Sequence, residues 1–171
     1  MPGASVNTRE RGQEMAGTDI YQLLEKDHRE VEQLFQRILS SRGEQAAGMT
    51  SPMALMNQLS QMLKAHMAAE ERTFYASLME NSQTREIVNE SRKEHEEARG
   101  LINEVSASES SVLLSRVQVL QQAIQHHVQE EEGKLFREAR QVIDQQMASQ
   151  IGSRFEQEKS REMGMGGMAG A

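Results

Sequence analysis

The sequence contains no cysteine and no tryptophan, only 2 prolines, and an aromatic content of 4%. Without cysteine the chain has no disulfide bonds, iron–sulfur clusters or thiolate metal sites, so any metal ion must be bound through nitrogen and oxygen. Helix-favouring residues dominate instead, among them glutamine, glutamate, alanine, leucine, methionine and arginine. We therefore expect an all-α protein, and 171 residues suffice for one domain with a buried core.

Long apolar runs and clusters of positive charge are also missing. The formal net charge is -7, and lysine and arginine are interleaved with acidic residues along the chain, so no surface for binding phosphates is expected. No run approaches the roughly 20 apolar residues that span a bilayer. Residues 1–17 lack the apolar stretch of a signal peptide. We expect a soluble, cytoplasmic protein that binds neither nucleic acid nor membranes, and the sequence leaves weak homo-oligomerisation open.

Apolar residues recur at helical spacing in five segments of the chain. The predicted helices cover residues 19–41, 51–80, 87–105, 113–142 and 144–159. Residues 1–17 are expected to form a disordered leader, residues 18–160 the folded domain, and residues 161–171 a flexible tail of glycine and methionine. The expected architecture is an antiparallel, up-down four-helix bundle with a short fifth C-terminal helix.

The second and fourth predicted helices carry the same motif. His66-Met67-Ala68-Ala69-Glu70-Glu71 aligns with His127-Val128-Gln129-Glu130-Glu131-Glu132. In the first and third helices, Asp27-His28 aligns with Glu94-His95. The chain therefore contains one helical hairpin twice, which predicts a pseudo-twofold axis and a symmetric, two-part site.

Each of the four long predicted helices places one histidine on its apolar stripe, and two glutamates follow a histidine by four residues on the same helical face. These candidate metal ligands are His28, His66, Glu70, His95, His127 and Glu131. Imidazoles and bridging carboxylates on facing helices are a common way to build a two-metal site in a bundle. A single inward histidine is more often a hydrogen-bonded core residue, but that reading does not explain six donors in repeat register. We interpret the set as a di-metal site.

One alternative ligand pair exists on the fourth helix. His126 lies about 100° around the helix from His127, so only one of the two can point inward. Choosing His126 would make Glu130 its partner, whereas His127 preserves both the apolar stripe and the four-residue step to Glu131. We choose His127.

Three further side chains lie next to the predicted ligands in the sequence. Glu71 and Glu132 would accept hydrogen bonds from ligand histidines, although a solvated helix face is the simpler reading. Tyr75 would bring a phenol to the site, although packing in the core is the simpler reading. The methionines of residues 51–80 are interpreted as core filler rather than copper ligands.

At these residues the chain resembles the hemerythrin family, in particular its bacterial HHE cation-binding branch. The segments similar to the family's first four helices are IYQLLEKDHREVEQLF, LKAHMAAEERTFY, KEHEEARGLI and HHVQEEEGKLF, and VIDQQMASQIGSRFEQEK is similar to its trailing helix. The resemblance implies two non-haem iron ions with a bridging oxo or hydroxo group, four histidine ligands and two bridging glutamates. One departure is Arg99, which stands where the dioxygen-carrying members have a second third-helix histidine.

Three functional hypotheses follow. The first is a di-iron protein that binds or reacts with dioxygen, peroxide or nitric oxide in oxidative stress or iron handling, which leaves open whether it decomposes peroxide as an enzyme. The second is an oxygen or iron sensor, or an iron store, without turnover. The third is a bundle whose polar core binds zinc or no metal. The resemblance favours the first, while Arg99 argues against reversible oxygen carriage.

Overall fold

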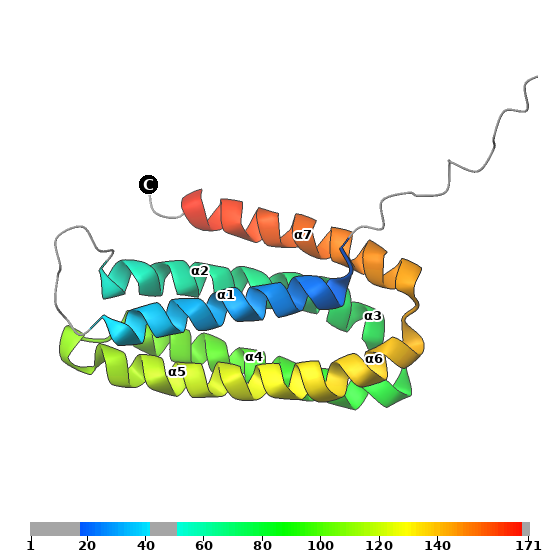
Figure 1. The fold of residues 1–171 in the computed structure, drawn as a ribbon, viewed down its shortest axis with the longest axis horizontal. Helices are drawn as coiled ribbons and strands as arrows, with labels where there is room; N and C mark the ends of the chain where they lie inside the picture. The colour runs from blue at the N-terminus through cyan, green and yellow to red at the C-terminus, as the bar shows by residue number, and fades with distance from the viewer. Residues whose placement is uncertain (1–17, 42–50, 169–171) are drawn as a thin grey trace, which may run out of the picture.

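The computed structural model describes residues 18–41 and 51–168, and within these ranges the chain is helical without any strand (Figure 1). The α-helices are α1 (Ile20–Ser40), α2 (Pro52–Glu70), α3 (Ala76–Leu78), α4 (Ser82–Ser106), α5 (Ser110–Glu130), α6 (Phe136–Val142) and α7 (Gln145–Met168). The expected helical bundle is thus confirmed. The predicted leader and residues 169–171 of the predicted tail lie outside the described ranges. Among the described helices, none has the length and apolarity needed to cross a membrane.

Side-chain caps fix where the helices begin. The Asp19 carboxylate accepts a hydrogen bond from the Gln22 amide at 3.0 Å at the start of α1, and the Ser51 hydroxyl accepts one from the Ala54 amide at 3.2 Å at the start of α2. The Asn81 side chain does the same for α4. These side chains satisfy amide groups that have no partner inside the helix, so the sequence signals for helix starts operate as expected.

A single turn of π-helix interrupts each of the two helices that carry the repeated motif. The segment η1 (Glu71–Tyr75) connects α2 to α3, and η2 (Glu131–Leu135) connects α5 to α6. Each of the predicted helices over residues 51–80 and 113–142 is therefore two α-helical segments joined by a π-helical turn. Isolated π-helical turns occur frequently at functional sites, and here both lie at the repeated glutamates.

The buried apolar residues form two clusters on either side of a polar layer. One cluster includes Phe35, Leu59 and Leu120, and the other includes Tyr75, Phe74 and Phe136. Between them lie the buried histidines and glutamates of α1, α2, α4 and α5. This layer is the only place in the described bundle where several ionisable side chains are buried together.

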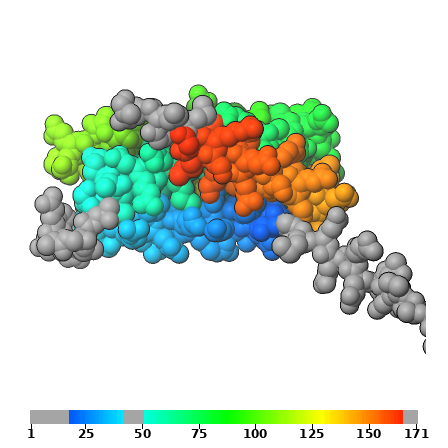
Figure 2. Space-filling view, turned by 90° about the horizontal axis from the view of Figure 1, so that it is seen from above, coloured from blue at the N-terminus to red at the C-terminus, as the bar shows by residue number. Residues whose placement is uncertain are grey.

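Helix α7 packs across α1 and α2, as Figure 2 shows from above. Ile151 and Phe155 bury their side chains in the second apolar cluster. The helix was expected to end at Lys159, but it continues to Met168, so the first part of the segment predicted as a flexible tail is helical. Backbone hydrogen bonding extends a helix through residues whose side chains contribute little, which the apolar pattern does not reveal.

A close backbone contact seats α7 on the start of α1. A Cβ atom at Gly152 would lie 2.6 Å from the Thr18 carbonyl oxygen, whereas a Cβ atom at Gly100 of α4 would have nothing within 4 Å. We expect Gly152→Ala to destabilise the protein by roughly 1–3 kcal/mol, because backbone must move. Gly100→Ala should stabilise it by about 0.5–1 kcal/mol through helix propensity. Urea unfolding of both variants checks this, and equal effects would contradict the close contact.

Candidate metal centre

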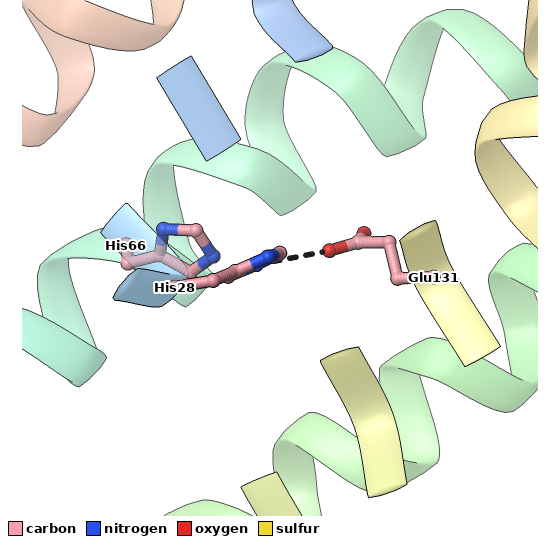
Figure 3. Close-up of side chains that lie close together, drawn as sticks. All are labelled: His28, His66 and Glu131. Carbon is pink, nitrogen blue, oxygen red and sulfur yellow. Dashed lines mark ion pairs between the residues drawn. The ribbon is translucent and has the colours of Figure 1, made fainter. Parts of the chain in front are cut away.

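The six predicted ligand side chains meet in the polar layer and form two groups of three. His28, His66 and Glu131 form one group, and Glu70, His95 and His127 form the other. Within each group one potential donor atom per residue lies within 4.8 Å of the others. Figure 3 shows the first group, in which His28 Nε2 lies 3.3 Å from Glu131 Oε2. All six side chains are buried, and Glu70 and Glu131 have no exposed surface.

Each glutamate lies between histidines of both groups. Glu70 Oε2 is 3.5 Å from His66 Nε2 on its own helix and 3.4 Å from His95 Nε2 on α4. Glu131 Oε2 is 3.8 Å from His127 Nε2 and 3.3 Å from His28 Nε2. The arrangement is symmetric, because each hairpin contributes its glutamate to the other hairpin's histidines. Both carboxylates therefore occupy positions from which they can bridge two cations.

A carboxylate accepts a hydrogen bond from the Nδ1 atom of every one of the four histidines. Two of these acceptors precede a ligand histidine in the sequence: Asp27 lies 2.9 Å from His66 Nδ1, and Glu94 lies 2.8 Å from His127 Nδ1.

The other two follow a ligand glutamate. Glu71 lies 2.9 Å from His95 Nδ1, and Glu132 lies 2.8 Å from His28 Nδ1. An ionised carboxylate can only accept, so each Nδ1 carries the proton and each Nε2 faces the centre of the layer.

Five of the inward-facing donor atoms lack hydrogen-bond partners among the described residues. These atoms are His28 Nε2, His66 Nε2, both carboxylate oxygens of Glu70, and Glu131 Oε2. His95 Nε2 and His127 Nε2 lie 3.1 Å apart, and with both protons on Nδ1 their lone pairs would repel. Two nitrogens that bind one ion at adjacent positions, about 2.1 Å from it, are separated by about 3 Å. The donor set therefore fits bound cations.

Burial and neighbouring charges shift the pKa values of the two central carboxyls in opposite directions. Burial, with the charge of Glu131 as a second cause, raises the pKa of Glu70 well above its usual range. Burial acts in the same sense on Glu131, but His28 and His127 outweigh it and hold that pKa low. Two adjacent buried carboxyls without a cation cannot both be ionised cheaply. The layer therefore has more buried carboxyl groups than its positive charges can neutralise.

The histidines divide in the same way. Burial lowers the pKa of His95 to about 4 and also lowers the pKa of His66, so both imidazoles are neutral at pH 7 and able to bind a metal ion. Burial opposes protonation of His28 as well, but the carboxylates of Glu131 and Glu132 prevail and raise its pKa to about 9. The positive charge of His28 thus balances Glu131 where a cation would.

Tyr75 contributes a phenol to this layer. Its hydroxyl donates to Glu131 Oε1 at 2.9 Å and lies 3.5 Å from His95 Nε2, and its ring stacks on that of His95. The sequence favours simple core packing for Tyr75, whereas the structure shows that its hydroxyl also binds a carboxylate of the site. The π-helical turn explains the difference, because it brings the residue five positions after Glu70 inward.

Two basic residues hold the outer carboxylates in place. Lys159 of α7 donates to Asp27, and Arg99 donates to Glu71 at 2.8 Å. Arg99 therefore contacts a hydrogen-bond acceptor of His95 instead of the centre of the layer. Sequence reasoning assigned no role to Lys159, because only the packing of α7 brings it to the site.

The structure resolves the alternatives on the fourth helix and corrects one reading. His127 is buried in the layer, while the His126 side chain is 66% exposed and lies 3.5 Å from Glu94. The prediction that Glu71 and Glu132 form a solvated face is wrong, since Glu71 accepts a hydrogen bond from His95 and Glu132 accepts one from His28. The acidic residues in the repeat, which also include Asp27 and Glu94, were the available signal.

Comparison with known proteins gives one family. The family profile described as Hemerythrin HHE cation binding domain matches residues 19–139. The match contains all six clustered side chains and ends before α7 begins. No curated protein and no solved structure matched the chain.

The hydrogen bond from His66 to Asp27 gives a test of the outer carboxylates. Asp27→Asn keeps the shape but removes the negative charge that increases the basicity of the imidazole, so we expect metal affinity to fall by about 10–100-fold. Competition with a fluorescent chelator measures the change. Glu30→Gln, on the exposed face of the same helix, is the matched control. If both variants kept the parent affinity, Asp27 would have no part in binding.

Proposed function

Because this chain belongs to the hemerythrin HHE cation-binding domain family, we propose that it is a non-haem di-iron protein that binds or reacts with dioxygen, peroxide or nitric oxide. The supporting observation is the pair of buried three-residue groups, in which donor atoms of His28, His66, Glu70 and Glu131 lack hydrogen-bond partners among the described residues. One iron would be held by His28, His66 and Glu131. The other would be held by Glu70, His95 and His127. The proposal includes the family's antiparallel, up-down order of the four long helices.

The donor chemistry supports iron. Imidazole and carboxylate ligands suit divalent and trivalent iron, and the absence of cysteine removes the thiolates that favour zinc or copper(I). Two bridging glutamates would neutralise part of the charge of two cations, and an oxo or hydroxo bridge would complete the pair. When bound, such a centre supplies electrons and open coordination positions to a small oxidant or gas.

The surrounding residues support a small, uncharged ligand. Beside the site lies an enclosed cavity of about 10 Å³, whose lining includes Val31, Leu63, Ala98 and Ile124. This volume is close to the least that holds one water-sized molecule. The apolar walls exclude bulk water from the site, and the Tyr75 hydroxyl keeps a proton next to Glu131.

A second candidate function is a sensor whose C-terminal helix responds to the occupancy of the site. Its supporting observation is that α7, outside the family match, is joined to the site at two points. Lys159 contacts Asp27, the acceptor of His66, and Glu158 and Glu162 contact Arg72, two residues after Glu70. Loss of a cation would therefore disturb the groups that hold α7.

Iron analysis and spectroscopy test the first proposal. Protein expressed with iron should contain two irons per chain. The anaerobic ferrous form should oxidise rapidly with peroxide or dioxygen and develop the near-ultraviolet absorption of oxo-bridged iron. Glu70→Gln should remove one bridging carboxylate and lower the iron content, whereas Glu96→Gln, an exposed residue beside His95, should not. A chain that binds zinc alone, or no metal, under these conditions contradicts the proposal.

Removal of metal tests the second candidate. Chelation should lower the melting temperature, because a ligand that binds only the folded state stabilises it. A sensor should in addition release α7, seen as faster hydrogen exchange over residues 145–168 than over residues 20–40. Uniform exchange in both states would leave the di-iron reaction as the sole proposed function.

A further inference from the structure

A groove between α1 and α5 reaches the candidate metal centre from the surface. It has a volume of about 380 Å³ and includes His28, Val31, Ile124, Val128 and Glu132 in its lining. Two contacts cross it: Gln125 donates to Glu32 at 3.3 Å, and His28 donates to Glu132 at 2.8 Å. His28 is thus the one predicted ligand that lines this groove.

The groove and the enclosed cavity beside the site share a wall. Four residues line both spaces: His28, Val31, Ile124 and Val128. Val128 is the only one of the four that is partly rather than fully buried. A movement of this small side chain would join the groove to the cavity.

The pseudo-equivalent position between α2 and α4 is closed. In the repeat, Val128 corresponds to Met67 and Glu32 corresponds to Arg99. Met67 is 1% exposed and fills its position, and Arg99 pairs with Glu71 at 2.8 Å. The α1–α5 side therefore has the small residue Val128 and the carboxylate of Glu32, whereas the α2–α4 side has the larger residue Met67 and the ion pair of Arg99 with Glu71.

Helix α7 covers a further side of the bundle, where it packs on α1 and α2 (Figure 2). Phe155 of α7 packs against the His66 ring with centroids 5.7 Å apart. The enclosed cavity has two partly buried lining residues, Val128 and Glu94. Glu94 accepts a hydrogen bond from His127 on the α4–α5 side, whereas Val128 lies in the wall that the cavity shares with the α1–α5 groove.

We propose that the α1–α5 groove is the route by which a small ligand reaches the site, with Val128 as its gate, and that the groove selects uncharged molecules. The selection follows from charge, because the lining has two acidic side chains, Glu32 and Glu132, and one basic side chain, Arg29, which pairs with Glu25 on its own helix. This inference rests on the proposed function for the identity of the ligand. The route itself is a property of the chain alone.

Substitution of the gate tests the route. In iron-loaded protein, Val128→Phe should slow the binding of nitric oxide by about tenfold. The larger side chain is over-packed and must move before the ligand can pass, which raises the barrier to entry. Val128→Ala should accelerate it. Val119→Phe, an equal substitution at an exposed position of α5, should have no effect. Stopped-flow absorbance measures the rates, and unchanged rates in both Val128 variants would overturn the proposal.

Charge provides a second measurement. Glu32→Gln should speed the binding of azide by about two- to fivefold at low salt and leave nitric oxide unchanged, because only the anion is repelled by the rim. The difference should vanish in high salt. Equal effects on both molecules would overturn the selection of uncharged ligands.

Xenon separates the route from the iron chemistry. Crystals of metal-free protein under xenon pressure should show xenon on the groove side of Val31, Ile124 and Val128, where the volume of about 380 Å³ has room for it, and Val128→Phe should displace it. If the protein binds no iron but xenon occupies this position, the proposed function fails and the route stands. If the protein binds iron but xenon is absent, the route fails and the proposed function stands.

Discussion

The hydrogen bonds from four histidine Nδ1 atoms to four carboxylates are the interactions on which the site depends. They fix the tautomer and the ring orientation, and so direct the Nε2 atoms of His28, His66, His95 and His127 to one layer. Each acceptor comes from a helix different from that of its histidine. The same four contacts therefore set the register of α1 against α2 and α5, and of α4 against α2 and α5.

Repetition of one hairpin produces this arrangement, and departures from the repeat give it two unlike sides. Tyr75 places a hydroxyl on Glu131, whereas its counterpart Phe136 has none to place on Glu70. The ion pair of Arg99 with Glu71 likewise has no counterpart at Glu132. The candidate ligands are therefore symmetric, while the residues around them are not.

The sequence predicted the helical class and brought the six candidate ligands to one layer because both follow from a 3.6-residue apolar rhythm. It favoured plain core packing for Tyr75 over a contact of the phenol with the site, since a π-helical turn shifts the face of the helix by one residue and leaves no mark in a regular pattern. The role of Lys159 was also out of reach, because it depends on how α7 packs. The sequence favoured a solvated face for Glu71 and Glu132 because their neighbours along the chain are acidic. Their role depends instead on His95 and His28, which lie on other helices.

The buried polar layer costs folding free energy that the rest of the bundle must offset. A buried polar atom without a partner costs about 1–3 kcal/mol, and His66 Nε2 and both carboxylate oxygens of Glu70 are such atoms. This cost is a large fraction of the net stability of a whole domain, about 5–15 kcal/mol. The two apolar clusters that flank the layer, and α7 across one side, offset part of this cost. Bound cations would remove the rest of this free-energy cost, because they would bind the same atoms that lack partners.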